Sequence, residues 1–204
     1  MKSKFNTNLK LIHSSIKSGK EHLTIDDKKT KYNLEDFWRW NMSDLISNAT
    51  RGILAEFIVA TAIGLDPKAF RNAWDAYDLI TPEGIKIEVK ASAYIQSWFQ
   101  KEYSKISFSI KPAHDWDSET NILGDEIKRH ADVYVFCLLK NKDQDTIDPL
   151  KLEQWEFYVV PTPVLSDYGG SQNRIILSKL KKIAVPVEYI ELNEAILKAS
   201  KYEK

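Results

Sequence analysis

The 204-residue chain contains one cysteine, four histidines and seven glycines. A single Cys137 excludes a disulfide framework within one chain, and its apolar, strand-like surroundings indicate a buried thiol rather than a nucleophile. The histidines show no metal-ligand spacing, which argues against the common zinc motifs. The glycines form neither a Gly-x4-Gly-Lys phosphate loop nor a Gly-x-Gly-x-x-Gly turn, so the nucleotide-binding classes that use these motifs are excluded.

Long apolar runs and a net charge are also missing. No run approaches the ~20 residues of a membrane-spanning helix, and the lysine-scattered start lacks the apolar stretch of a signal peptide. We therefore expect no membrane association and a cytoplasmic location. The formal net charge at pH 7 is zero, which gives the whole molecule no general attraction for nucleic acid.

The charge is unevenly distributed along the chain. Residues 1–31 hold eight lysines and three acidic residues, a net charge of +5, whereas residues 114–156 hold five basic and eleven acidic residues, a net charge of −6. We predict a basic N-terminal arm over residues 1–32, which either follows a nucleic acid strand or is simply solvated. The remainder, residues 33–204, is predicted to form a single domain.

The segment from residue 77 to residue 90 has the pattern of a β-hairpin. Apolar β-branched residues alternate with charged ones from residue 85 onward, so Glu88 and Lys90 share one face of a strand. Pro-Glu-Gly at 82–84 is turn chemistry. With that loop, the register sets Asp78 directly opposite Glu88, with Cβ atoms roughly 5 Å apart.

Two carboxylates at that separation repel each other unless a cation lies between them. Carboxylate oxygens suit magnesium or manganese, which also take phosphate oxygens as ligands. Asp75 is a competing candidate for the first carboxylate, but it lies in the loop that enters the strand, so Asp78 is favoured.

The preceding segment, Ala49 to Leu65, is predicted to be a helix that is apolar almost all round and therefore buried. Its charged residues are Arg51 and Glu56. An ionised carboxylate inside such a helix must be paired or must coordinate a metal. Glu56 is therefore either a third acidic ligand or the partner of a lysine such as Lys86.

Glu56 on a helix, followed by Asp78 and by Glu88-Val89-Lys90 on consecutive strands, resembles the core of the PD-(D/E)xK nuclease superfamily of restriction endonucleases and Holliday-junction resolvases. The resemblance implies an α/β fold with a restriction endonuclease-like core, in which helices flank a central mixed β-sheet and the hairpin lies at its centre. It implies that Asp78, Glu88 and the Val89 carbonyl bind the metal, that Glu56 supports it directly or through water, and that Lys90 positions or activates the attacking water.

The resemblance further implies a Mg²⁺-dependent enzyme, with Mn²⁺ as an alternative ion, that hydrolyses DNA and leaves a 5′-phosphate. We expect a homodimer, because a duplex has two strands to cut. The chain departs from the motif at Tyr77, which stands where a proline would precede Asp78. The alternative is a non-catalytic nucleic-acid-binding or scaffold protein that retains the fold and uses the charged face for ion pairs.

Downstream of the motif, Ser92 shares the strand face of Lys90 and is expected to support the site. Gln96 is expected to contact substrate or to order the waters of the metal. Tyr94 and Trp98 either stack on bases or pack in the core, and we favour the core. A helix is predicted at 33–46, with Asn33 as its cap and its apolar residues packed over the core. Further helices are predicted at 124–130 and, capped by Asn193, at 194–201, and further strands at 105–111, 131–139 and 155–161.

Overall fold

The computed structural model describes residues 11–66, 76–117, 120–170 and 172–202. Its helices are α1 (Leu34–Met42), α2 (Asn48–Ala62), α3 (Thr162–Gly169), α4 (Leu177–Leu180) and α5 (Leu192–Ser200), with short 3-10 turns at Leu152–Gln154 and Tyr189–Glu191. Its strands are β1 (His22–Ile25), β2 (Lys28–Asn33), β3 (Leu79–Ile80), β4 (Lys86–Ala93), β5 (Ser107–Ser109), β6 (Trp116–Asp117), β7 (Ile122–Leu123), β8 (Val133–Leu139), β9 (Trp155–Pro161), β10 (Arg174–Ile176) and β11 (Pro186–Val187).

The main sheet has, within the described residues, five strands in the order β11-β9-β8-β4-β3. The β4–β8 pair is parallel, and the other pairs are antiparallel. The sheet is therefore mixed, and the predicted α/β class is confirmed. The β3–β4 hairpin lies at one edge of this sheet, however, and not at its centre as predicted. β8 is the inner neighbour of β4, while β3 forms the outermost strand.

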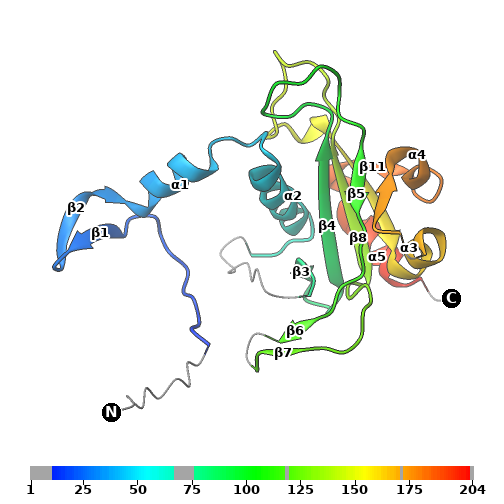
Figure 1. Cartoon of the computed structure of the whole chain (residues 1–204), viewed down its shortest axis with the longest axis horizontal. Helices are drawn as coiled ribbons and strands as arrows, with labels where there is room; N and C mark the ends of the chain where they lie inside the picture. Colours follow the sequence, from blue (N-terminus) through cyan, green and yellow to red (C-terminus); the bar gives the residue numbers. More distant parts are fainter. Residues whose placement is uncertain (1–10, 67–75, 118–119, 171, 203–204) are drawn as a thin grey trace, which may run out of the picture.

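Two apolar layers cover the two faces of the sheet (Figure 1). On one face, α2 and α5 pack against alternate residues of β4 and β8 such as Ile87 and Val135. On the other face, β5, β10, α3 and α4 pack against the intervening residues such as Phe136. All seven residues of β8 are buried, as expected of a strand covered on both faces. Helices on both faces were predicted, and this is confirmed.

Several predicted elements differ in the structure. No helix forms at 124–130; the adjoining chain makes the small β6–β7 hairpin, and Ala113 forms a bridge with Lys128. α5 starts at Leu192, so Asn193 lies inside the helix rather than capping it. A 3-10 turn directly precedes the helix, and reciprocal hydrogen bonds between Glu188 and Glu191 close the start of this turn. The helix therefore begins two residues earlier than the predicted residue 194.

The N-terminal part of the chain forms its own small unit, which projects from the sheet and its covering helices (Figure 1). Within the predicted basic arm, β1 and β2 form an antiparallel hairpin around a turn at Asp26 and Asp27, both with positive φ. Asn33 caps α1, as predicted. α1 nevertheless has no buried residue, so the expectation that it packs over the core is wrong.

Candidate active site at the edge of the sheet

The register of the β3–β4 hairpin brings the predicted carboxylates together. Leu79 pairs with Ile87, and one residue further out the register places Asp78 opposite Glu88. The Asp78 backbone N–H donates to the Ile87 carbonyl at 3.0 Å, and at the other end the Thr81 N–H donates to the Ile85 carbonyl at 3.0 Å. The turn and the strand pairing are therefore those that the alternation of residue types predicted.

Asp78, Glu88 and Lys90 form one charged cluster on this hairpin. The Lys90 Nζ lies 3.7 Å from Asp78 Oδ2 and makes a closer ion pair with Glu88 Oε1. The three side chains keep between 19% and 29% of their surface exposed, so solvent reaches them but screens them only in part. The same oxygen, Asp78 Oδ2, also accepts a 2.7 Å hydrogen bond from the Val89 N–H, which ties the Asp78 side chain to β4.

The charges of the cluster shift the pKa values of its own members. Burial raises the pKa of Glu88, and the charge of Asp78 raises it further, against the opposing effect of Lys90. Burial would lower the pKa of Lys90, but the charges of Asp78 and Glu88 outweigh it and the pKa is raised. Lys90 therefore stays protonated at neutral pH, while an ionised Glu88 is held against an unfavourable field.

The backbone carbonyl of Val89 points toward the same edge. In a strand, the N–H and C=O of one residue point to the same side, and sides alternate along the chain. Since the Val89 N–H donates to Asp78, the Val89 C=O is directed to the Asp78 side as well. Two carboxylates and one carbonyl thus converge on one edge of β4.

Glu56, the third predicted acidic residue, lies on another element. It lies half-buried on α2, which packs on the sheet face that carries Ile87 and Val89. Its negative charge raises the pKa values of both Glu88 and Lys90, although it is the last of the named contributions in each case. Glu56 therefore acts on the cluster electrostatically, but its helix packs on the face of β4 opposite to the one that carries Glu88 and Lys90.

A magnesium ion is the group that the resemblance implies here. In the described ranges, no three His, Cys, Asp or Glu side chains are grouped so as to hold a metal ion. The donor chemistry nevertheless fits Mg²⁺, which is typically bound by one or two carboxylates and completes its shell with waters and phosphate oxygens. Asp75, the competing candidate, lies outside the described residues.

The residues that follow the motif take different places. Ser92 is half-buried on the same face of β4 as Lys90. Gln96 is buried and bound to the protein: its Nε2 donates to the Ala93 carbonyl at 2.9 Å and to Ser104 Oγ at 3.1 Å, and its Oε1 accepts from Arg51 at 3.3 Å. Gln96 therefore ties the end of β4 to the start of α2, and in this arrangement it does not present its amide to a substrate.

The sequence analysis named Arg51 without giving it a contact, and it did not name Tyr134. Arg51 is only 2% exposed and donates to the Ile46 carbonyl and to Asn48 as well as to Gln96, so it anchors the helix that carries Glu56. Tyr134 pairs with Glu88 across the parallel β4–β8 ladder. Burial, followed by the charge of Glu88, raises the pKa of Tyr134 and keeps its phenol neutral. Only knowledge of the strand order could have placed Tyr134 there.

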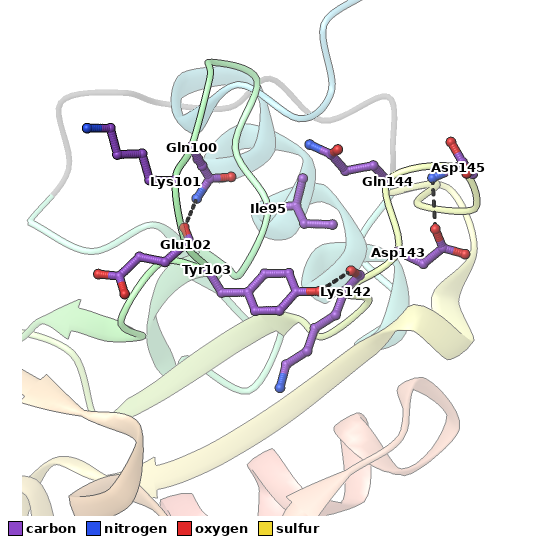
Figure 2. Close-up of a pocket in the computed structure, with 9 residues that line it drawn as sticks. All are labelled: Ile95, Gln100, Lys101, Glu102, Tyr103, Lys142, Asp143, Gln144 and Asp145. Atoms are coloured by element: carbon purple, nitrogen blue, oxygen red, sulfur yellow. Dashed lines mark hydrogen bonds between the residues drawn. The ribbon is translucent and has the colours of Figure 1, made fainter.

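A separate cavity of about 470 Å³ lies beyond the ends of β4 and β8, between two loops (Figure 2). Its wall includes Tyr103, whose hydroxyl donates to the Lys142 carbonyl at 2.8 Å, while the Lys142 Nζ lies 4.3 Å from the Tyr94 ring centre. Tyr94 packs partly into the core, as favoured. Trp98 does not, because 54% of it is exposed. None of the residues around this cavity belongs to the carboxylate–lysine cluster.

Fold and site together define an α/β protein with a nuclease-like core, in which the hairpin at the sheet edge brings Asp78 and Glu88 together beside Lys90. The family comparison agrees with this class. The family model of bacteriophage T4 endonuclease IV matches residues 4–167, most of the chain and all of the candidate site. The chain belongs to this family, which identifies it as a DNA endonuclease and confirms the predicted nuclease class.

A comparison with curated proteins gave no match. In the part of the chain that the structure describes, no helix has the length and apolar character needed to cross a bilayer.

Proposed function

We propose that the protein is a Mg²⁺-dependent DNA endonuclease whose catalytic core is of the PD-(D/E)xK type. The observation that carries the proposal is the convergence of Asp78, Glu88 and the Val89 carbonyl on one strand edge, with the Lys90 ammonium within reach of both carboxylates. This is the set of groups that hydrolysis of a phosphodiester needs: oxygen ligands for a hard cation and a fixed positive charge beside them.

Each side chain has a distinct role in this proposal. Asp78, Glu88 and the Val89 carbonyl would hold Mg²⁺ (or Mn²⁺), which supplies Lewis-acid chemistry at the phosphate when bound. Lys90 orients the attacking water and faces the negative charge that develops on the phosphate oxygens. Glu56 orders water on the α2 side. Attack of this water on phosphorus breaks the bond to the 3′ oxygen and leaves a 5′-phosphate.

The electrostatics support a role for Glu88 that depends on a cation. Since burial and Asp78 raise its pKa, an added positive charge at the edge would favour its ionised form. The pair of carboxylates is therefore better satisfied with a divalent ion than without one. We further propose that the enzyme works as a homodimer, in which two such edges act on one nucleic acid.

A cleavage assay tests the proposal. The full-length protein is incubated with supercoiled, linear and single-stranded DNA in Mg²⁺ or in EDTA, beside Glu88→Gln and Lys90→Met. We expect cleavage in Mg²⁺ only, and at least about a 100-fold lower rate for both variants. Matched controls are Glu83→Gln in the exposed turn and Lys86→Met on the same strand, both of which should keep the parent rate.

The alternative, a non-catalytic nucleic-acid-binding protein, draws on the ion pairs that Lys90 makes with both carboxylates. It predicts DNA binding that neither Glu88→Gln nor EDTA abolishes, and no cleavage of any of the DNA forms. Cleavage that survives in Glu88→Gln or in EDTA contradicts the proposed site. A variant of Glu56, Glu56→Gln, separates a supporting role from a central one, because a group acting through water is expected to cost about tenfold rather than 100-fold.

A further inference from the structure

Four lysines line a hollow at the β11 edge of the main sheet, the edge opposite β3. The hollow has a volume of about 730 Å³ and lies between the C-terminal end of α5, the segment that follows α4, and strands β9 and β11. No Asp or Glu is among the described residues that line it. Its wall therefore carries only positive charges, those of Lys181, Lys182, Lys198 and Lys201.

The four lysines have no anionic partner within the described ranges, because none of the ion pairs found there involves them. All four residues are exposed. A lysine near a helix C-terminus interacts favourably with the helix dipole, and Lys198 in the last turn of α5 has this position. That effect accounts for single lysines at helix ends, but it does not require four of them around one hollow. Their charge is therefore available to a ligand.

The remaining lining residues are apolar except for the hydroxyl of Tyr202, and they include Val159, Pro161 and Ala195. Apolar side chains neither donate nor accept hydrogen bonds. Lysine stems can lie along such a surface while their ammonium groups stay in water. The hollow is therefore suited to a ligand that is bound by its negative charge, and not to one that is selected by several directed hydrogen bonds.

A second hollow, of about 540 Å³, adjoins the first and reaches the strand that carries the candidate site. Ala199 and Tyr202 line both hollows. From them the second hollow extends past Asp132 to Lys86, the first residue of β4, and Glu88 is two residues further along that strand. Neighbouring strands are ~4.8 Å apart, so β11 and β4, three positions apart in the sheet, are separated by about 14 Å. The two hollows thus lead from the lysines to the start of β4.

The cations of the second hollow already have contacts within the protein. The Lys86 Nζ lies 5.3 Å from the Tyr77 ring centre, and the Lys128 Nζ makes a 2.6 Å ion pair with Glu126. Arg129 donates three hydrogen bonds to uncharged oxygen atoms, which hold its guanidinium against the fold. Among the described residues that line the two hollows, the four lysines of the first are therefore the cations best placed to bind an external anion.

We propose that these four lysines bind backbone phosphates of the DNA substrate away from the bond that is cut, and that the DNA runs from them along the two hollows toward Glu88 and Lys90. The inference rests on the proposed function for the position of the cut bond, while the family supplies DNA as the polyanion. Phosphates repeat every ~3.4 Å along one strand, so about four of them span the distance between β11 and β4. Because the whole chain carries no net charge, such a local cluster sets the orientation of the DNA on the protein.

Binding of DNA to the full-length protein in EDTA tests this role without any cleavage. The fluorescence anisotropy of a short labelled DNA, as a duplex and as a single strand, is measured at several salt concentrations. The pair variants Lys198→Gln/Lys201→Gln and Lys181→Gln/Lys182→Gln should each raise the dissociation constant at least about tenfold at ~0.1 M salt. Each pair should also reduce the slope of log K against log salt by about 1–2, because each lysine that contacts a phosphate releases about one counterion.

Lys101→Gln/Lys151→Gln is the matched control. These two lysines are also exposed, and they lie at the other end of the sheet, beyond the end of β4 and before the start of β9. The control removes the same charge and should keep the parent affinity and salt slope. In the cleavage assay, Lys198→Gln/Lys201→Gln should raise KM and leave kcat unchanged, because contacts away from the reacting phosphate bind substrate and transition state equally.

The proposal is overturned by a protein that does not bind DNA in EDTA, or by lysine pair variants whose affinity and salt slope match those of Lys101→Gln/Lys151→Gln. The second result would leave an acidic protein surface as the ligand of the four lysines. Because binding in EDTA does not involve cleavage, a failed lysine site and a failed nuclease activity remain distinguishable.

Discussion

Replacement of Lys90 by methionine tests the electrostatics of the candidate site. The substitution keeps the length of the side chain and removes the positive charge between Asp78 and Glu88. The Cβ atoms of Asp78 and Glu88 are expected roughly 5 Å apart, and two negative charges at about that separation repel by about 3 kcal/mol at an effective dielectric constant of 20. Protonation of Glu88 would remove this repulsion. For a carboxyl with the ordinary pKa of 4.5, protonation at pH 7 costs about 3 kcal/mol. Lys90→Met should therefore lower the free energy of unfolding by up to about 3 kcal/mol.

The pH dependence has a definite sign. In the variant, the folded-state pKa of Glu88 rises further above its unfolded value, so the folded protein binds the extra proton and its stability falls as pH rises above about 4.5. The loss relative to the parent should thus be largest near pH 7 and should vanish below pH 4.5. Urea unfolding at several pH values measures it. Lys86→Met, an exposed lysine on the same strand whose Nζ lies over the Tyr77 ring, is the control and should lose less than about 1 kcal/mol.

A variant Lys90→Met with parent stability at pH 7 would refute this reasoning. So would a loss that is independent of pH, because that result would assign the effect to packing of the side chain rather than to the charge of the two carboxylates.

Other positions give shorter tests. Gly19→Ala should destabilise the N-terminal unit by about 1–3 kcal/mol, because φ is +90° and the added Cβ would lie 2.9 Å from a tryptophan ring atom. Faster hydrogen exchange in residues 18–42 would show this loss. Gly52→Ala in α2, with no atom within 4 Å of the new Cβ, should instead stabilise the protein by about 0.5–1 kcal/mol. Arg51→Met and Gln96→Met should each cost about 1–3 kcal/mol, and a double-mutant cycle should show them to be coupled. Cys137 should not react with thiol reagents until the protein unfolds, since it is fully buried and burial raises its pKa.

The hairpin of the site could be predicted because the residues that determine it are close together in the sequence. The alternation from Ile85 to Lys90 and the Pro-Glu-Gly turn set the register without reference to the rest of the chain, and the structure confirms the pairing that follows from them. The strand predicted at 155–161 also has the observed bounds, since its β-branched and aromatic residues are buried between two layers.

Features that depend on distant contacts could not be read in the same way. The position of the hairpin at the sheet edge depends on β8 pairing in parallel with β4, which no local pattern records. The buried Gln96 accepts a hydrogen bond from Arg51, 45 residues earlier. α1 was expected over the core because its apolar residues were assumed to need a partner within the chain, and the structure leaves them uncovered. The metal, and the contributions of Glu56 and Ser92 to it, stay predictions.

The hydrogen bond from the Val89 N–H to the Asp78 carboxylate also affects how this protein meets its neighbours. An edge strand offers a row of main-chain donors and acceptors to any other strand that approaches, which is a route to aggregation. β3, the outermost strand, has only two residues, and beyond its end the Val89 N–H of β4 is already held by a charged side chain, next to a second carboxylate that would have to lose its hydration. The same negative charges that would attract an ion thereby keep a foreign strand from joining the sheet.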